Sequence, residues 1–210
     1  MKRLSLLLFL ALPALASWRD TFQSRLEIHA LLQSLNGELL ASSSATRTLE
    51  TWCGEHRMGS KIVAVRVPDA RKEPSPEQLQ RLAVRDASEV QYRRVELRCG
   101  AHVFSEADNW YVPARLTSEM NSLLSTTDTP FGKVVAPLTP YRRTLAATML
   151  WTPLPRGWEL QRRPRSCWRC RRLVLPKELF QHRAVLYTTE HLPFSEVVET
   201  YQSELLNFER

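Results

Sequence analysis

Apolar and charged side chains alternate most clearly in the stretch YRRVELRC, residues 92–99. A period of two is typical of a strand with one buried face, so this stretch predicts a strand. Arg93 falls on the apolar face of that strand, beside Val95. A buried guanidinium needs a partner, which predicts either an anionic ligand or a glutamate of the same fold. A third interpretation is that the Arg93 side chain turns outward at the strand end.

Five further stretches are predicted to be strands. They are residues 61–67, 103–112, 141–151, 183–190 and 194–206, which together with residues 92–99 make six predicted strands. Turns at Gly100 and before Pro193 join four of them into two hairpins. Capping residues and apolar stripes predict helices beginning near Asp20, Ser44, Ser75 and Thr117. Short connections between the strands predict an α+β fold, a single antiparallel six-stranded sheet with helices packed on one face.

The first sixteen residues have the features of a signal peptide. Lys2 and Arg3 precede an apolar run, and Ala14-Leu15-Ala16 places small residues where a signal peptidase reads. We therefore expect residues 1–16 to be removed and residues 17–210 to form one domain, expected to be monomeric. The apolar run is too short to anchor the chain in a bilayer, so no stable membrane insertion of the mature chain is expected. The expected location is outside the cytoplasm, in the periplasm if the source is Gram-negative.

Four cysteines would meet an oxidising compartment after export. Of the three connectivities, we expect Cys53 with Cys99 and Cys167 with Cys170. The first pair would close a loop of 46 residues, worth about 3 to 4 kcal/mol in the chain-entropy model. The sequence Cys167-Trp-Arg-Cys170 has the spacing of a redox or metal motif, but a local disulfide is favoured because no strand leads into a helix there. Without a second such motif, no metal site is expected.

The segment from about 153 to 177 changes the charge balance of a chain with a formal net charge of +7. It carries arginines at 156, 162, 163, 165, 169, 171 and 172 and a single glutamate at 159. We interpret it as a basic excursion between strands, with a solvated surface. No nucleic-acid-binding module surrounds it, so no nucleic acid partner is expected. The chain also lacks the GxSxG motif of a serine hydrolase.

A family resemblance appears when the motifs are taken in order. The chain has Ser44-Ala45-Thr46 opening a helix, then YRRVELRCG, ADNWYVP, DTPFG and the closing hairpin. This succession resembles the chorismate lyase (chorismate pyruvate-lyase) family, whose fold is shared with the ligand-binding domain of certain transcription regulators. The resemblance covers most of residues 43–201 except the basic excursion. No single motif is specific, and their shared order carries the resemblance.

The resemblance implies an active site buried between the sheet and the helices. It also implies a carbon–oxygen lyase that needs no cofactor and eliminates pyruvate from chorismate to leave 4-hydroxybenzoate. An arginine would hold a substrate carboxylate while a carboxyl group supplies a proton to the departing enolpyruvyl group. The family's arginine falls at Arg93 by alternation or at Arg94 by counting back from Cys99. Its glutamate falls at Glu199 after a shift of one residue.

The remaining family positions complete the implied site. The segment Thr129, Pro130, Phe131 and Gly132 matches a Thr-Pro-Leu-Gly motif that helps to enclose the ligand. Ala45 stands where the family has a methionine, which would enlarge or reshape the cavity.

The family's enzymes work in the cytoplasm, whereas this chain carries an export signal. The alternative function is therefore a non-catalytic exported domain that binds a small aromatic or carboxylate ligand in the same pocket. A third interpretation is that Arg93 and Glu199 form an ion pair in a core without ligand.

Overall fold

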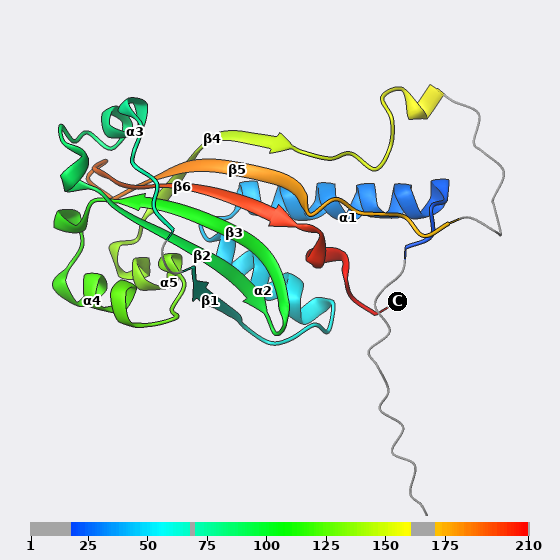
Figure 1. Ribbon diagram of the computed structural model, residues 1–210, viewed down its shortest axis with the longest axis horizontal. Helices are drawn as coiled ribbons and strands as arrows, with labels where there is room; N and C mark the ends of the chain where they lie inside the picture. Colours follow the sequence, from blue (N-terminus) through cyan, green and yellow to red (C-terminus); the bar gives the residue numbers. More distant parts are fainter. Residues whose placement is uncertain (1–17, 68–69, 161–170, 210) are drawn as a thin grey trace, which may run out of the picture.

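The computed structural model describes residues 18–67, 70–160 and 171–209, and its main element is a six-stranded sheet (Figure 1). The strands are β1 (Ile62–Arg66), β2 (Gln91–Cys99), β3 (His102–Tyr111), β4 (Tyr141–Met149), β5 (Glu178–Tyr187) and β6 (Pro193–Gln202). All neighbours are antiparallel, in the order β1-β2-β3-β6-β5-β4. The expected α+β class and the single antiparallel six-stranded sheet are confirmed.

Local chemistry explains where the strands turn and end. Gly100 adopts a left-handed backbone conformation with φ of 57° between β2 and β3, which a glycine does without the clash that a Cβ would cause. Strand β5 begins at Glu178, five residues before the predicted start, because Glu178 already pairs with Gln202 of β6. Strand β6 ends at Gln202, before the predicted end at 206, because the chain turns there into a 3-10 helix, η5 (Ser203–Leu206).

In the described ranges, five α-helices accompany the sheet. They are α1 (Phe22–Ala41), α2 (Ala45–Glu55), α3 (Pro76–Arg81), α4 (Ser118–Thr126) and α5 (Phe131–Val134). The side chains of Ser44 and Ser75 cap α2 and α3, as predicted. Thr21 caps α1 instead of Asp20, because Asp20 pairs with Arg25 at 2.6 Å. Helix α5 lies in a stretch for which the sequence predicted only a loop.

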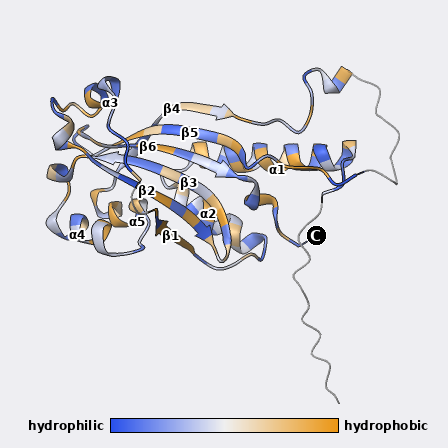
Figure 2. Ribbon diagram, in the orientation of Figure 1, coloured by the Kyte–Doolittle hydropathy of each residue, from blue (hydrophilic) through white to orange (hydrophobic). Residues whose placement is uncertain are grey.

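The main core lies between the sheet and the two long helices, which run behind it in Figure 1. Leu32 and Leu35 of α1 and Leu49 of α2 are fully buried there, as are Phe180 and Tyr201 of the sheet. Figure 2 shows hydrophobic and hydrophilic positions alternating along α1, as expected of a helix with one face on a core. Helices α4 and α5 lie at one end of the sheet (Figure 1).

The opposite face of the sheet carries a smaller cluster. Leu82, after α3, packs there with Trp110 and Val198. Arg81 donates to Glu196, a fully buried carboxylate on β6, through Nε at 2.7 Å and through a second nitrogen at 2.9 Å. This bidentate pair and the apolar cluster attach the α3 segment to the face that α1 and α2 leave uncovered.

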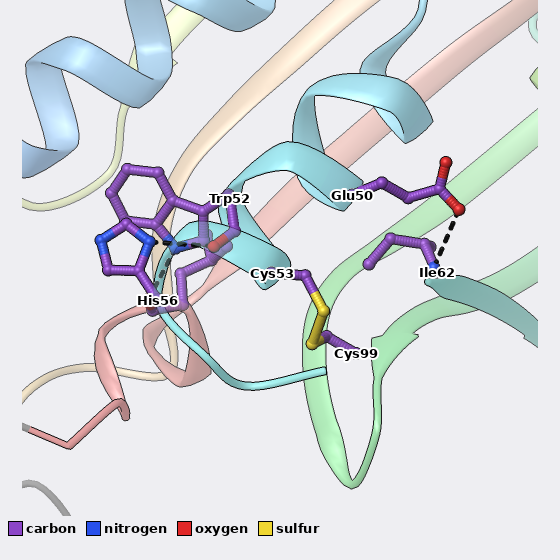
Figure 3. The surroundings of a disulfide bond; sticks show 7 residues. Glu50, Trp52, Cys53, His56, Ile62 and Cys99 are labelled. Atoms are coloured by element: carbon purple, nitrogen blue, oxygen red, sulfur yellow. Dashed lines mark hydrogen bonds between the residues drawn. A yellow bond between two sulfur atoms is a disulfide. The ribbon is translucent and has the colours of Figure 1, made fainter. Parts of the chain in front are cut away.

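A disulfide joins the end of α2 to the end of β2 (Figure 3). The Cα atoms of Cys53 and Cys99 are 6.0 Å apart, which confirms the predicted pair. Gly59 lies against the bridge, and a Cβ placed there would be 3.0 Å and 3.2 Å from the two sulfur atoms. Beside it, Glu50 accepts a hydrogen bond of 3.1 Å from the backbone of Ile62 at the start of β1.

Several sequence predictions concern residues outside the described ranges. The signal peptide, the pairing of Cys167 with Cys170 and residues 161–170 of the basic excursion stay predictions for that reason. Among the described residues, no helix combines the length and the apolar character needed to cross a membrane.

Candidate ligand-binding site

The helix-covered face of the sheet carries the candidate site residues. Strand pairing places Arg93 opposite Asn109 and Asn109 opposite Val197. Glu199 lies on the same face, because it is opposite Ala107 and two residues from Val197. The alternation in the sequence therefore assigned both charged residues to the correct face. They do not share a cavity, however.

Arg93 lies on the wall of a cavity of about 530 Å³, which we call the Arg93 cavity. Only 6% of Arg93 is exposed. Its Nη2 donates a long hydrogen bond of 3.3 Å to the carbonyl oxygen of Thr129. Its Nε and Nη1 are buried and have no hydrogen-bond partner among the described residues. Burial lowers the pKa of the Arg93 guanidinium, because a desolvated cation is disfavoured.

The remainder of the Arg93 cavity is also cationic and partly aromatic. Its charged and aromatic lining comprises Arg66, Arg71, Arg93, Arg94, Tyr92, Tyr111 and Asp128. Asp128 is the only acid that the described residues contribute to this lining. The cavity therefore presents more positive than negative charge to whatever occupies it.

Glu199 lines a second, much smaller cavity of about 50 Å³, which we call the inner pocket. Arg142 of β4 donates to Glu199 Oε2 at 2.6 Å, and 8% of each side chain is exposed. The hydroxyl of Tyr201 donates to the same oxygen at 3.3 Å. Burial and the neighbouring carboxylate raise the pKa of Tyr201 well above its usual value, which keeps the phenol protonated as a donor.

The predicted site residues divide between the two cavities. The inner pocket is lined by Ala45, Phe131, Gly132 and Glu199. The Arg93 cavity is lined by Arg93 and Arg94. Thr129 contributes its carbonyl oxygen to Arg93, and Pro130 precedes α5. The loop of residues 128–132 thus separates the two cavities, because Asp128 lines one and Phe131 with Gly132 lines the other.

Arg93 and Arg94, between which the sequence left the choice open, differ in the partners of their side chains. Arg94 forms an ion pair with Glu106 on β3 and lies 3.9 Å from Asp108. Both carboxylates are on the face opposite to Arg93, since Arg94 is paired with Asp108 across the strands. Arg94 thus has its partners within the fold, whereas two buried nitrogens of Arg93 have no partner in the part of the chain that the structure describes.

Arg142 is the site residue that the sequence analysis missed. Two arginines follow each other at 142 and 143, and β4 lies at an edge of the sheet with most of its residues exposed. Alternation along such a strand does not tell which arginine points inward. The signal that could have singled out Arg142 and Arg143 is Glu199, because a carboxylate that points inward needs a cation as its partner.

Comparisons with known proteins identify one relative with substantial sequence identity. No family model matches the chain. The uncharacterized protein y4mC of Sinorhizobium fredii is 46% identical over 195 residues, which cover 91% of this chain and 81% of y4mC. The chain belongs to the y4mC family. That relative is described as uncharacterized, so membership of the y4mC family assigns no activity.

Solved structures show weaker similarity to this y4mC family member. The ligand-binding domain of a protein assigned to the GntR family of transcriptional regulators, from Bordetella bronchiseptica, has a TM-score of 0.44 and 16% identity, covering 69% of this chain and 85% of that chain. The effector domain of PhnF from Mycobacterium smegmatis has a TM-score of 0.44 and 10% identity, covering 70% and 90% respectively. Values this low support no statement about function.

Proposed function

We propose that this protein is a non-catalytic binding domain for a small aromatic carboxylate, or a similar small anion, with Arg93 as the anchor. The observation that carries the proposal is the buried Arg93 guanidinium, whose Nε and Nη1 find no partner among the described residues and lie beside a cavity of about 530 Å³. Small-molecule sites commonly have volumes of about 300 to 1,000 Å³. The Arg93 cavity falls within that range.

The chemistry of the cavity favours an anionic and partly aromatic ligand. A buried cation without a partner costs several kcal/mol in principle, and a carboxylate or phosphate offers a guanidinium two parallel hydrogen bonds. Tyr92 and Tyr111 add aromatic surface to the lining of the cavity. A ring carrying one carboxylate would satisfy both features, with the carboxylate at Arg93.

The division of the site supports binding over turnover. Elimination of pyruvate would require the arginine and the acid to act on one substrate. Glu199 is instead engaged by Arg142 in an inner pocket of about 50 Å³. Chorismate lyase activity is kept as the second candidate, because Ala45, Phe131, Gly132 and Glu199 gather around one pocket as the family resemblance implies.

Ligand-induced stabilisation tests the proposed binding. The mature protein is heated with benzoate, 4-hydroxybenzoate, a series of related aromatic carboxylates, and inorganic phosphate. At least one of these anions should raise Tm in proportion to RT ln(1 + [L]/Kd). The rise should disappear in Arg93→Met and persist in Arg98→Met, the matched control on the same strand, whose side chain pairs with Glu96 and does not line the cavity. No rise with any of the anions, or an undiminished rise in Arg93→Met, would overturn the proposal.

Turnover is tested separately with chorismate. The mature protein is incubated with chorismate, and 4-hydroxybenzoate and pyruvate are quantified over time. The binding proposal expects no formation above the rate without protein. Equal amounts of both products, lost in Glu199→Gln, would establish the lyase and replace the non-catalytic interpretation.

We also propose that the protein acts after export, in the periplasm if the source is Gram-negative. The Cys53–Cys99 disulfide supports this location, because such bonds persist mainly in oxidising compartments. Mass spectrometry of the native protein should find an N-terminus at or close to Ser17. An intact Met1 on soluble protein from the cytoplasmic fraction would contradict export.

A further inference from the structure

The inner pocket adjoins a recess on the surface between α2 and α5. This α2–α5 recess has a volume of about 360 Å³, and its lining includes Ser43, Ser44, Arg47, Glu50, Gly132 and Lys133. Ser43, Ser44 and Gly132 also line the inner pocket. The wall between the recess and the pocket therefore consists of the start of α2 on one side and the start of α5 on the other.

Gly132 lies where the start of α2 meets the start of α5 in that wall, a contact that we call the seam. A Cβ added to Gly132 would be 3.7 Å from Thr46 Oγ1 and 3.8 Å from Ser44 Oγ. Both distances are ordinary van der Waals contacts, so one methyl group would fit and a larger side chain would fill the remaining gap. Thr46 lines the inner pocket but not the recess, and Ser44 lines both. The position of Gly132 thus determines how wide the seam is.

The charges around the recess are unequal. Lys133 pairs with Glu50 at 2.6 Å, and Glu50 also accepts the backbone hydrogen bond from Ile62. Arg47 is exposed and forms no ion pair with any described residue. Among the described residues that line the recess, Arg47 is therefore an uncompensated cation beside the seam, and such a charge raises the local concentration of anions.

We propose that the inner pocket is reached from solvent through the α2–α5 recess, between Ser44 and Gly132, and that Arg47 makes this passage selective for small anions. The proposal goes beyond anion binding at Arg93, because it concerns the other cavity. In this proposal Gly132 sets the width of the passage, and Arg47 sets its preference for anions.

A cysteine reporter in the inner pocket tests the passage without any knowledge of the ligand. Ala45 is 7% exposed and lines the inner pocket but not the recess, so Ala45→Cys places a thiol behind the seam. Cys167 and Cys170 are replaced by serine to remove competing thiols. Iodoacetate and iodoacetamide, matched in size, are compared; with either, the thiolate displaces iodide to form a thioether. Each rate is divided by the rate for the same protein unfolded in urea.

The comparison of the two reagents tests the charge preference, and the substitutions at Gly132 test the width of the passage. Normalised modification by iodoacetate should be about threefold to tenfold faster than by iodoacetamide, and Arg47→Gln should remove the difference. Gly132→Val should slow both reagents by about tenfold or more, because its side chain overfills the seam. Gly37→Val is the matched control, since a Cβ at Gly37 meets nothing within 4 Å. It should leave both rates unchanged.

Either test can overturn the proposal. Modification rates that are unchanged in Gly132→Val would show that the pocket opens elsewhere. Slower modification in Ala70→Val, which alters the wall of the Arg93 cavity, would then identify that cavity as the route. Equal normalised rates for the two reagents would remove the charge preference. Urea denaturation checks each variant for folding. If Gly132→Val does not fold, Gly132→Ala takes its place and should slow both reagents by a smaller factor. None of these results depends on whether a carboxylate binds Arg93.

Discussion

Arg93 and Arg142 are two buried arginines on the same face of one sheet, and they differ in what they touch. Arg142 donates to Glu199 at 2.6 Å, whereas the one acceptor that the described part of the chain offers to Arg93 is the carbonyl oxygen of Thr129 at 3.3 Å. Burial acts against the charge of both. For Arg142 the Glu199 carboxylate outweighs burial and raises the pKa, while for Arg93 burial prevails and the pKa is lowered.

Under the proposed function, the difference separates a residue that maintains the fold from one that binds a ligand. A paired buried cation is part of the structure, and removing it leaves its carboxylate stranded. A buried cation with unsatisfied nitrogens is itself a cost to stability, and removing it relieves that cost. The two arginines should therefore respond to the same substitution in opposite ways.

The largest effect is expected for Arg142→Met. The substitution keeps the apolar volume but leaves Glu199 buried without its cation, which should lower the free energy of unfolding by about 3 to 5 kcal/mol. Urea denaturation measures the change. The double variant Arg142→Met/Glu199→Gln should recover much of the loss, because it leaves no buried charge. A loss below about 1 kcal/mol in the single variant would show that the pair contributes little.

The next effect is expected for Arg93→Met and depends on the ligand. Affinity for the anion found by the stabilisation assay should fall by about 2 to 4 kcal/mol, because the bound anion loses its buried partner. Titration calorimetry measures this change. Without ligand, the free energy of unfolding should stay constant or rise. A loss in ligand-free stability as large as that of Arg142→Met would mean that Arg93 is a structural residue and would erase the contrast.

Tyr201→Phe sharpens the account of the paired arginine. The substitution removes the hydrogen bond of 3.3 Å to Glu199 but leaves the ion pair with Arg142 intact. The expected loss is about 0.5 to 1.5 kcal/mol, typical of one hydrogen bond, by thermal or urea unfolding. A loss equal to that of Arg142→Met would show that Tyr201, and not Arg142, is the main partner that stabilises the buried carboxylate of Glu199.

The smallest effect is expected from the partly exposed ion pair of Arg94 with Glu106, and it should appear as a dependence of stability on pH. Burial alone would raise the pKa of Glu106, but hydrogen bonds from Lys177, Gln202 and Arg94 lower it to about 2. A lowered carboxyl pKa stabilises the fold above the unfolded value near 4.5, and this stability is lost as the pH falls from about 4.5 towards 2. Because 69% of the Lys177 side chain is exposed, the expected loss is only about 1 kcal/mol.

Glu106→Gln provides the control for this pH dependence. Denaturation midpoints measured between about pH 2 and pH 5 should vary less in the variant than in the wild type. Added salt should reduce the difference between the two proteins, since solvent reaches the pair. An identical pH profile in both would show that other carboxyl groups account for the acid sensitivity.

The residues that sequence analysis placed correctly are those with a strong local pattern. Arg93 could be assigned to the buried face because its strand alternates over eight residues, and Cys99 ends the same strand near Cys53. The hairpins followed from their turns, and with the two further strands at 61–67 and 141–151 they gave the six-stranded sheet.

The residues that sequence analysis could not place depend on contacts distant in the chain. Arg142 meets Glu199 across 57 residues, and β4 has an irregular register between Thr144 and Ala146 that breaks its alternation. Helix α5 is only four residues long, too short to leave a periodic signal. The separation of the two cavities follows from how the loop of residues 128–132 folds between them, which no local pattern specifies.

The bond between Cys53 and Cys99 also has a topological consequence. The two cysteines are 46 residues apart, so the backbone between them and the bridge form one covalent ring that contains β1 and α3. A single proteolytic cut within the ring opens it without dividing the molecule. The exposed residues 71–73, which follow β1, can therefore be cleaved, and both fragments stay attached until a reductant breaks the sulfur–sulfur bond. Arg93 belongs to this ring, so its cavity is among the parts of the molecule that such a nick cannot detach.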